Sequence, residues 1–223
     1  MNSLASQTRL ITGMRMTRDE FMRTWDALPD LKRAELIEDI VYAASPVSVE
    51  HGRFDIRAGA LVVAYADATP GCEPGHGGTW LMLTSAPQPD IMLRITDAYG
   101  GQSTISGNYY SGAPELAIEV SVTSRALDFG PKLALYQRAG VREYVTLEPA
   151  KRRITWRELI DGCYLEWAPG ADGIYRSRVF PGLWLNADAL WALDGPAIQA
   201  TLIAGLASQE HQEFVETLKG AKR

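Results

Sequence analysis

Hydrophobic and polar residues alternate most regularly in the segment ELAIEVSV, residues 115–122. Residues two apart on an extended chain point to the same side of a sheet. One side of this segment is apolar and consists of Leu116, Ile118, Val120 and Val122. The other side consists of Ala117, Glu119 and Ser121. The pattern predicts a β-strand that carries a carboxylate in the middle of one side.

A helix and a second strand are expected directly after this segment. Pro131 suits the first position of a helix, and Gly140 is typical of the residue that ends one. The segment REYVTL, residues 142–147, is then typical of a strand. A strand, a helix and a strand in this order predict two parallel strands joined by a right-handed crossover.

Two further helices and a strand or hairpin are predicted upstream. The spacing of Thr17 and Glu20 is that of a capping box, and the helix that it begins is expected to end at Pro29. Residues 34–46 predict a strand or hairpin. Residues 49–66 predict a second helix, and four residues are expected to form its buried stripe: Ile56, Ala60, Val63 and Ala64. Residues 1–16 are expected to be a flexible arm.

The middle of the chain predicts two strands between two loops. Residues 67–79 and 99–112 are rich in glycine and polar residues, which favours loops. The apolar segments 81–83 and 89–95 are typical of strands. The C-terminal part predicts a β-meander at 154–160, 164–167 and 176–180, with a hairpin turn at Asp161-Gly162, and then one helix at 196–218.

These elements predict an α/β (α+β) fold with a mixed central sheet flanked by helices and an added C-terminal β-meander. The expected division is an arm at 1–16, a domain at 17–195 and a C-terminal helix at 196–223. A chain of 223 residues with 46% hydrophobic residues can bury one core of this kind.

Charge and cysteine content narrow the classes of function. The formal net charge of −5 gives no global attraction to nucleic acid, so binding would depend on a local basic rim. Six residues could form such a rim or a solvated mixed-charge surface: Lys32, Arg33, Arg53, Arg57, Arg125 and Arg138. Two widely separated cysteines and no signal-peptide or membrane pattern favour a reducing, cytoplasmic setting without membrane contact.

Two acidic residues interrupt apolar strands and are candidates for a metal site. Asp90 enters the strand at 89–95, and Glu119 lies in the middle of the strand at 115–122. Burying a carboxylate is costly unless it is paired or faces a cleft. Two carboxylates on neighbouring strands would offer the hard oxygen ligands that Mg²⁺ and Mn²⁺ prefer. The alternatives are that Asp90 binds its own backbone in a turn and that Glu119 faces solvent.

These residues resemble the signature of the PD-(D/E)XK nucleases, in which Pro-Asp on one strand precedes Glu-x-Lys on the next. Here Ser121 stands at the lysine position, and Lys132 in the following helix offers a replacement. The stretch from Gly112 to Pro149 further resembles the Uma family of restriction endonucleases. The matching residues are Glu119, Ser121, Ser124, Asp128, Lys132, Tyr136, Gly140, Tyr144 and Pro149, with looser matches at Glu35, Pro46, His51 and Asp90.

The resemblance implies a restriction-endonuclease-like core and a metal-dependent endonuclease that hydrolyses phosphodiester bonds, with DNA as substrate. Asp90 and Glu119 would bind Mg²⁺ or Mn²⁺, Lys132 would orient water or phosphate, and Glu35 would be an auxiliary catalytic acid. Cleavage of both strands by one site per chain suggests a homodimer.

Other functions remain open at this point. A catalytically silent member of the fold could act as a nucleic-acid or protein interaction module, which the acidic balance and Ser121 favour. A serine hydrolase using Ser121 or Ser124 lacks a nucleophile elbow. His51 could be a ligand, a base or a structural histidine. The run Cys72, Glu73 and His76 lacks the second ligand pair of a zinc site.

Overall fold

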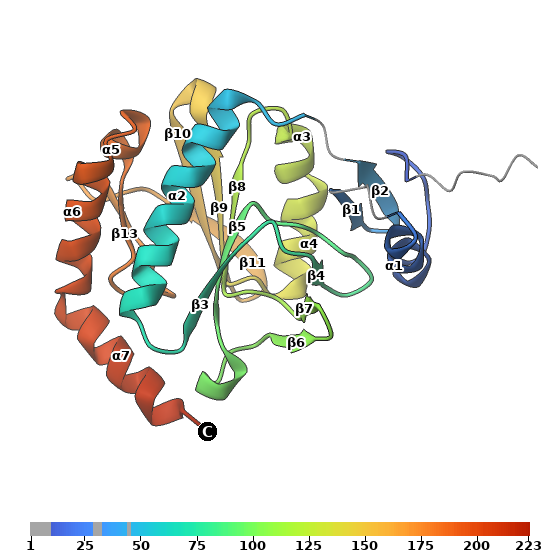
Figure 1. The fold of residues 1–223 in the computed structure, drawn as a ribbon. Coiled ribbons are helices and arrows are strands. Elements are labelled where there is room, and N and C mark those ends of the chain that lie inside the picture. The colour runs from blue at the N-terminus through green and yellow to red at the C-terminus, as the bar shows by residue number, and fades with distance from the viewer. Residues whose placement is uncertain (1–9, 29–32, 44–45) are drawn as a thin grey trace, which may run out of the picture.

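The computed structural model describes residues 10–28, 33–43 and 46–223. Its centre is a six-stranded mixed sheet (Figure 1). In spatial order its strands are β11 Cys163–Trp167, β10 Arg153–Ile160, β9 Glu143–Glu148, β8 Leu116–Val120, β5 Ile91–Ile95 and β3 Cys72–His76. Strands β8 and β9 are parallel, and the other neighbouring pairs are antiparallel. The predicted mixed central sheet is confirmed.

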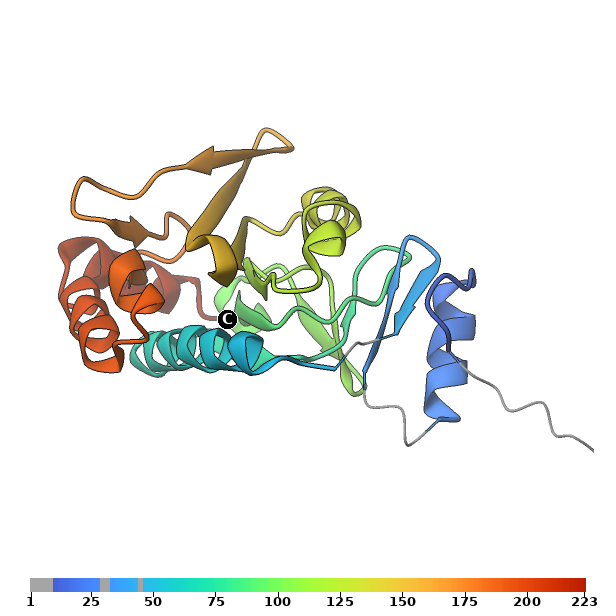
Figure 2. The same ribbon diagram turned by 90° about the horizontal axis from the view of Figure 1, so that it is seen from above.

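Helices cover both faces of this sheet (Figure 2). One face packs against α2 Val49–Ala68, α5 Ala187–Trp191, α6 Gly195–Leu206 and α7 Gln209–Ala221. The short α3 Arg125–Asp128 and α4 Pro131–Ala139 lie on the other face. Short 3₁₀ turns, η1 Asp97–Tyr99 and η2 Pro149–Lys151, follow β5 and β9.

The alternation in β8 places its residues in two different cores. Leu116, Ile118 and Val120 pack on the side of α2, whereas Ala117 packs on the side of α4. Helix α4 connects β8 to the parallel β9, as the strand–helix–strand pattern predicts. A glycine in the left-handed region, Gly140 at φ 88°, ends α4.

The N-terminal part forms a small unit beside the sheet. Helix α1 Arg18–Asp26 has the expected capping box, and the expected end at Pro29 lies outside the described residues. Strands β1 Ala34–Ile37 and β2 Ile40–Ala43 form the predicted hairpin. Its turn residues, Glu38 and Asp39, have φ values of 52° and 64°.

The expected flexible arm falls partly outside the described residues. Residues 1–9 are not described. Residues 10–16 run alongside β2, where Gly13 N–H donates to Val41 O and Val41 N–H donates to Met14 O. This stretch therefore extends the β1–β2 unit.

The expected buried stripe of α2 is wrong. Ile56 and Val63 are 70% and 46% exposed, and the buried face instead consists of Phe54, Ala58, Leu61, Val62, Tyr65 and Ala66. Hydrophobic residues surround much of this helix, so their identity alone does not select a face. The large rings of Phe54 and Tyr65 bury the most area, and they turn the helix toward the sheet.

Two segments that were expected to be loops contain strands. β3 lies within 67–79 and forms an edge of the sheet, where a residue such as Pro74 without an N–H is tolerated. The segment 99–112 contains the hairpin of β6 Thr104–Ser106 and β7 Tyr109–Ser111, which pairs with β4 Trp80–Leu81. The ring of Tyr110 stacks on Trp80 with centroids 4.5 Å apart, and this contact holds the hairpin.

The C-terminal part differs from the prediction in two details. Strands β10 and β11 form the expected hairpin and widen the central sheet, while β12 Ile174–Arg176 and β13 Trp184–Asn186 form a separate ribbon. β12 ends early because the backbone of Arg178 and Val179 donates to Glu143. The expected single C-terminal helix is two helices, since Ser208 caps a new helix, α7. No helix in the described ranges has the length and apolar character needed to cross a membrane.

The corrected face of α2 predicts different effects for two of its residues. Leu61→Ala removes a buried side chain and should lower the free energy of unfolding by about 2–5 kcal/mol. Ile56→Ala on the exposed face should change it by less than about 0.5 kcal/mol. Urea unfolding followed by circular dichroism measures both. Equal losses would contradict this orientation of α2.

Candidate active site

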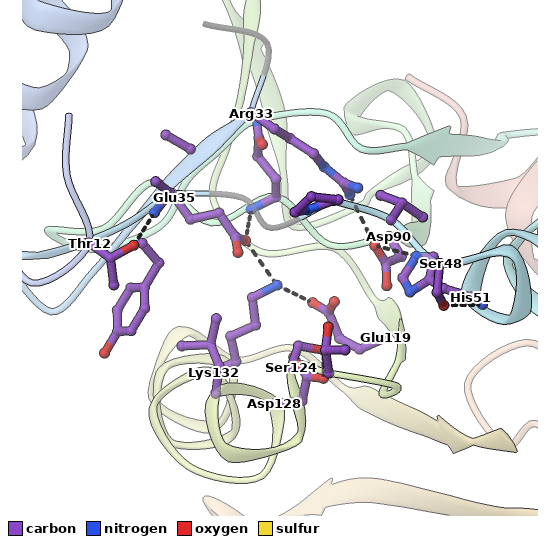
Figure 3. Close-up of a pocket in the computed structure, with 18 residues that line it drawn as sticks. Thr12, Arg33, Glu35, Ser48, His51, Asp90, Glu119, Ser124, Asp128 and Lys132 are labelled. Carbon is purple, nitrogen blue, oxygen red and sulfur yellow. Dashed lines mark hydrogen bonds and ion pairs between the residues drawn. The ribbon is translucent and has the colours of Figure 1, made fainter. Parts of the chain in front are cut away.

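The four residues proposed from the sequence line one pocket of about 270 Å³. It lies where β1, the start of α2, β5, β8 and the α3–α4 segment meet (Figure 3). Glu35 comes from β1, Asp90 directly precedes β5, Glu119 lies in β8 and Lys132 lies in α4. The fold thus gathers side chains that are far apart in the sequence.

Among the described residues, Glu119 accepts hydrogen bonds through only one of its two carboxylate oxygens. Its side chain points from β8 toward α4 and is 2% exposed, so it does not face solvent. Glu119 Oε1 accepts hydrogen bonds from Lys132 Nζ at 2.9 Å and from Tyr136 Oη at 2.8 Å. Lys132 and Tyr136 lie one turn apart on α4 and therefore reach the same oxygen. Within the described residues, Glu119 Oε2 accepts no hydrogen bond.

Lys132 is buried between two carboxylates. Its Nζ lies 2.9 Å from Glu119 Oε1 and 2.9 Å from Glu35 Oε1, and the residue is 3% exposed. Glu35 Oε1 also accepts the backbone N–H of Gln88 at 2.6 Å. Burial would lower the pKa of Lys132, but the surrounding carboxylates, Glu119 first, raise it above its usual value. Lys132 therefore stays charged.

Asp90 joins three elements through its two oxygens. Asp90 Oδ2 accepts the backbone N–H of Val120 at 2.9 Å, so the carboxylate binds the neighbouring strand and not its own turn. Asp90 Oδ1 lies 3.0 Å from Arg33 Nη2 and 3.5 Å from His51 Nε2. His51 Nδ1 is 3.0 Å from the carbonyl oxygen of Val120. Burial alone would raise the pKa of Asp90, but the contact with His51, the charge of Lys132 and the N–H of Val120 together lower it.

The serine at the usual lysine position belongs to a separate hydrogen-bond group. The hydroxyls of Ser121 and Ser124 both donate to Asp128 Oδ2. His51 contacts Val120 and Asp90 and not these serines, so the geometry does not favour a serine hydrolase. Burial raises the pKa of Asp128, which lines the same pocket.

Four residues beside the proposed set have no single role predicted from the sequence. Arg33 is a candidate for a basic rim, His51 for a ligand, a base or a structural histidine, and Asp128 and Tyr136 match the family pattern. For Tyr136 the available signal is its four-residue spacing from Lys132, because residues four apart share one face of a helix, whereas Asp128 belongs to the separate helix α3.

The run near Cys72 is not part of this pocket. Cys72 packs against the core, Glu73 pairs with Arg94 at 2.8 Å and His76 pairs with Asp55 at 2.7 Å. Within residues 10–28, 33–43 and 46–223, no group of three or more His, Cys, Asp or Glu side chains is arranged to hold a metal ion. A cation in the pocket would therefore rely on fewer side-chain ligands.

A family model described as "Uma2: Putative restriction endonuclease" matches residues 18–188. This chain belongs to the Uma2 family. The Uma2 match covers β8, α4 and every residue of the Glu35–Lys132–Glu119 group. Membership places the chain among the restriction-endonuclease-like nucleases.

A solved structure has the same fold as this Uma2 chain. It is described as a putative nuclease from Anabaena variabilis and has a TM-score of 0.62 at 14% sequence identity. The match covers 80% of this chain and 98% of that chain. No curated protein matches the chain.

Restriction-endonuclease-like nucleases generally use divalent metals, and the donor set of this Uma2 pocket fits such an ion. Four carboxylates, those of Glu35, Asp90, Glu119 and Asp128, face two permanent cations, Arg33 and Lys132. Burial, with the neighbouring carboxylates, raises the pKa of Glu119, as expected where negative charge is in excess. Among the described residues, Asp128 Oδ1 is buried without a hydrogen-bond partner, and His51 Nε2 has only the contact of 3.5 Å with Asp90 Oδ1.

Removing the central cation should destabilise the Uma2 fold. Lys132→Met leaves Glu35 and Glu119 unpaired and should cost about 3–5 kcal/mol of the free energy of unfolding. The double variant Lys132→Met with Glu119→Gln should be more stable than Lys132→Met alone, because one buried charge is removed. Thermal and urea unfolding compare the three proteins. A double variant that is less stable than Lys132→Met alone would contradict a direct ion pair.

Proposed function

We propose that this chain is a metal-dependent endonuclease that hydrolyses phosphodiester bonds in DNA. The observation that carries the proposal is the pairing of two buried carboxylates from neighbouring strands in one pocket. Asp90 directly precedes β5 and Glu119 lies in β8, and Glu119 Oε2 is left open while Oε1 is bound. Family membership supports phosphodiesters as the substrate class.

Asp90 and Glu119 would hold Mg²⁺ or Mn²⁺ through carboxylate oxygens, which are hard ligands. When bound, such an ion would lower the pKa of a water molecule and stabilise charge that develops on the phosphate. The excess of carboxylates in the pocket favours a divalent cation, because its charge would balance theirs.

Lys132 would orient the attacking water or the phosphate. An ammonium group has three N–H donors, and Glu35 and Glu119 take two of them. The third donor would serve the substrate. Glu35 would act as an auxiliary acid by keeping the ammonium in position. The oxygen of water would form a bond to phosphorus while the bond from phosphorus to the leaving oxygen breaks.

A catalytically silent interaction module is the second candidate. Ser121 at the usual lysine position and a net charge of −5 favour it. The two functions differ in metal binding, because an interaction module does not need an ion held by Glu119. If the chain is a nuclease, cleavage of both strands by one site per chain suggests a homodimer.

Isosteric neutral variants test the nuclease. Asp90→Asn and Glu119→Gln each remove one carboxylate and should lower Mn²⁺-dependent plasmid cleavage at least about a hundredfold. Both should also weaken Mn²⁺ binding in calorimetry. Glu216→Gln is the matched control, because Glu216 is an exposed carboxylate on α7.

The same measurements decide between the two candidates. Cleavage by both variants at the wild-type rate would exclude the assignment of Asp90 and Glu119. Wild-type protein that binds no Mn²⁺ in a Glu119-dependent way would favour the interaction module.

A further inference from the structure

Arg33 lies at the mouth of the pocket, where it forms an ion pair with Asp90 Oδ1. The residue directly precedes β1, and its guanidinium reaches across the pocket toward Asp90 (Figure 3). Arg33 Nη2 is 3.0 Å from Asp90 Oδ1. The side chain of Arg33 is 32% exposed, compared with 9% for Asp90. The ion pair therefore joins a buried carboxylate to a guanidinium that is partly exposed to solvent.

Asp90 has one oxygen available for a cation. Its Oδ2 is held by the backbone N–H of Val120, which is part of the sheet. Its Oδ1 accepts a hydrogen bond from Arg33 and also lies 3.5 Å from His51 Nε2, whose ring is held by Val120 through Nδ1. Binding of a divalent ion through Oδ1 would bring two cations to the same oxygen, and their mutual repulsion would move the one that is free to turn. That group is Arg33.

The surroundings allow Arg33 to leave Asp90. Gly77 lies beside the guanidinium, and a Cβ added at Gly77 would have only Arg33 Nη2 within 4 Å, at 3.8 Å. The side chain of Arg33 is 32% exposed, so the guanidinium can turn toward solvent. Lys132, the other permanently charged cation that lines the pocket, is 3% exposed and bound by two carboxylates, so it cannot move in the same way.

We propose that Arg33 has two successive partners: Asp90 before a divalent cation binds, and a phosphate of the nucleic acid afterwards. This inference rests on the proposed nuclease function. A guanidinium keeps its charge at all relevant pH values, and its planar fork of donors fits two phosphate oxygens. Arg33 thereby balances the charge of Asp90 in the free protein and supplies positive charge to the substrate side of the pocket in the complex.

The proposal predicts opposite effects of one substitution. Arg33→Ala should strengthen Mn²⁺ binding several-fold, because the competing cation is gone. The same variant should weaken binding of a short labelled DNA duplex in Ca²⁺ about tenfold, as expected for one lost phosphate contact. The slope of log affinity against log salt should fall by about 0.9, which corresponds to one phosphate. A merely structural role of Arg33 would not strengthen metal binding.

Two further variants control the experiment. Arg33→Lys keeps the charge but loses the fork, so it should bind Mn²⁺ like the wild type and DNA with intermediate affinity. Arg178→Ala removes another exposed arginine that pairs with a carboxylate, Glu158, outside this pocket, and should change neither affinity. Circular dichroism and thermal unfolding establish that each variant is folded.

The outcomes separate this inference from the proposed function. If the wild type binds Mn²⁺ through Glu119 but Arg33→Ala weakens that binding or leaves DNA affinity unchanged, the role of Arg33 is overturned and the nuclease stands. If Mn²⁺ binding by the wild type does not depend on Glu119, both are overturned. If Arg33→Ala fails to fold, Arg33→Lys decides: weaker Mn²⁺ binding or unchanged DNA affinity in that variant overturns the proposal.

Discussion

The structure around the pocket depends on the burial of a carboxylate in the middle of the sheet. Glu119 cannot reach bulk water from β8, so its charge must be matched inside the protein. Lys132 provides the match from α4 and also binds Glu35 on β1. This one ammonium thereby links the βαβ unit to the N-terminal hairpin.

The peptide that follows Glu119 makes a second connection. Val120 donates its N–H to Asp90, and its carbonyl oxygen lies 3.0 Å from His51 Nδ1. Contacts to the backbone of Val120 therefore position the start of β5 and the first turn of α2 against β8. An isolated carboxylate pair would be free to move, whereas these contacts hold Asp90 and Glu119 in the same pocket.

The charges in this pocket are not arranged for stability alone. Carboxylates outnumber permanent cations, and among the described residues Asp128 Oδ1 is buried without a hydrogen-bond partner. An excess of buried like charge lowers stability and is typical of sites that bind a charged ligand. Ser121 stands where the usual motif has a lysine. The ammonium that contacts Glu119 comes instead from Lys132 on helix α4.

The sequence by itself determined the elements with a clear period and local end signals. These are the β8 strand, helix α4 between Pro131 and Gly140, and the parallel pairing of β8 with β9. It also predicted Asp90 and Glu119 as acids beside or within apolar strands, and the structure places both in one pocket. Local pattern suffices there, since alternation and capping act over neighbouring residues.

Only the tertiary structure decided the face of α2, the edge strand β3 and the partners of the buried charges. These depend on contacts between residues that are distant in the chain, as Tyr110 with Trp80 and Arg33 with Asp90 illustrate. Sequence spacing carries no information about which charged groups meet across elements. Which charged groups become buried together is decided only when the elements pack. This packing places Lys132 between Glu35 and Glu119.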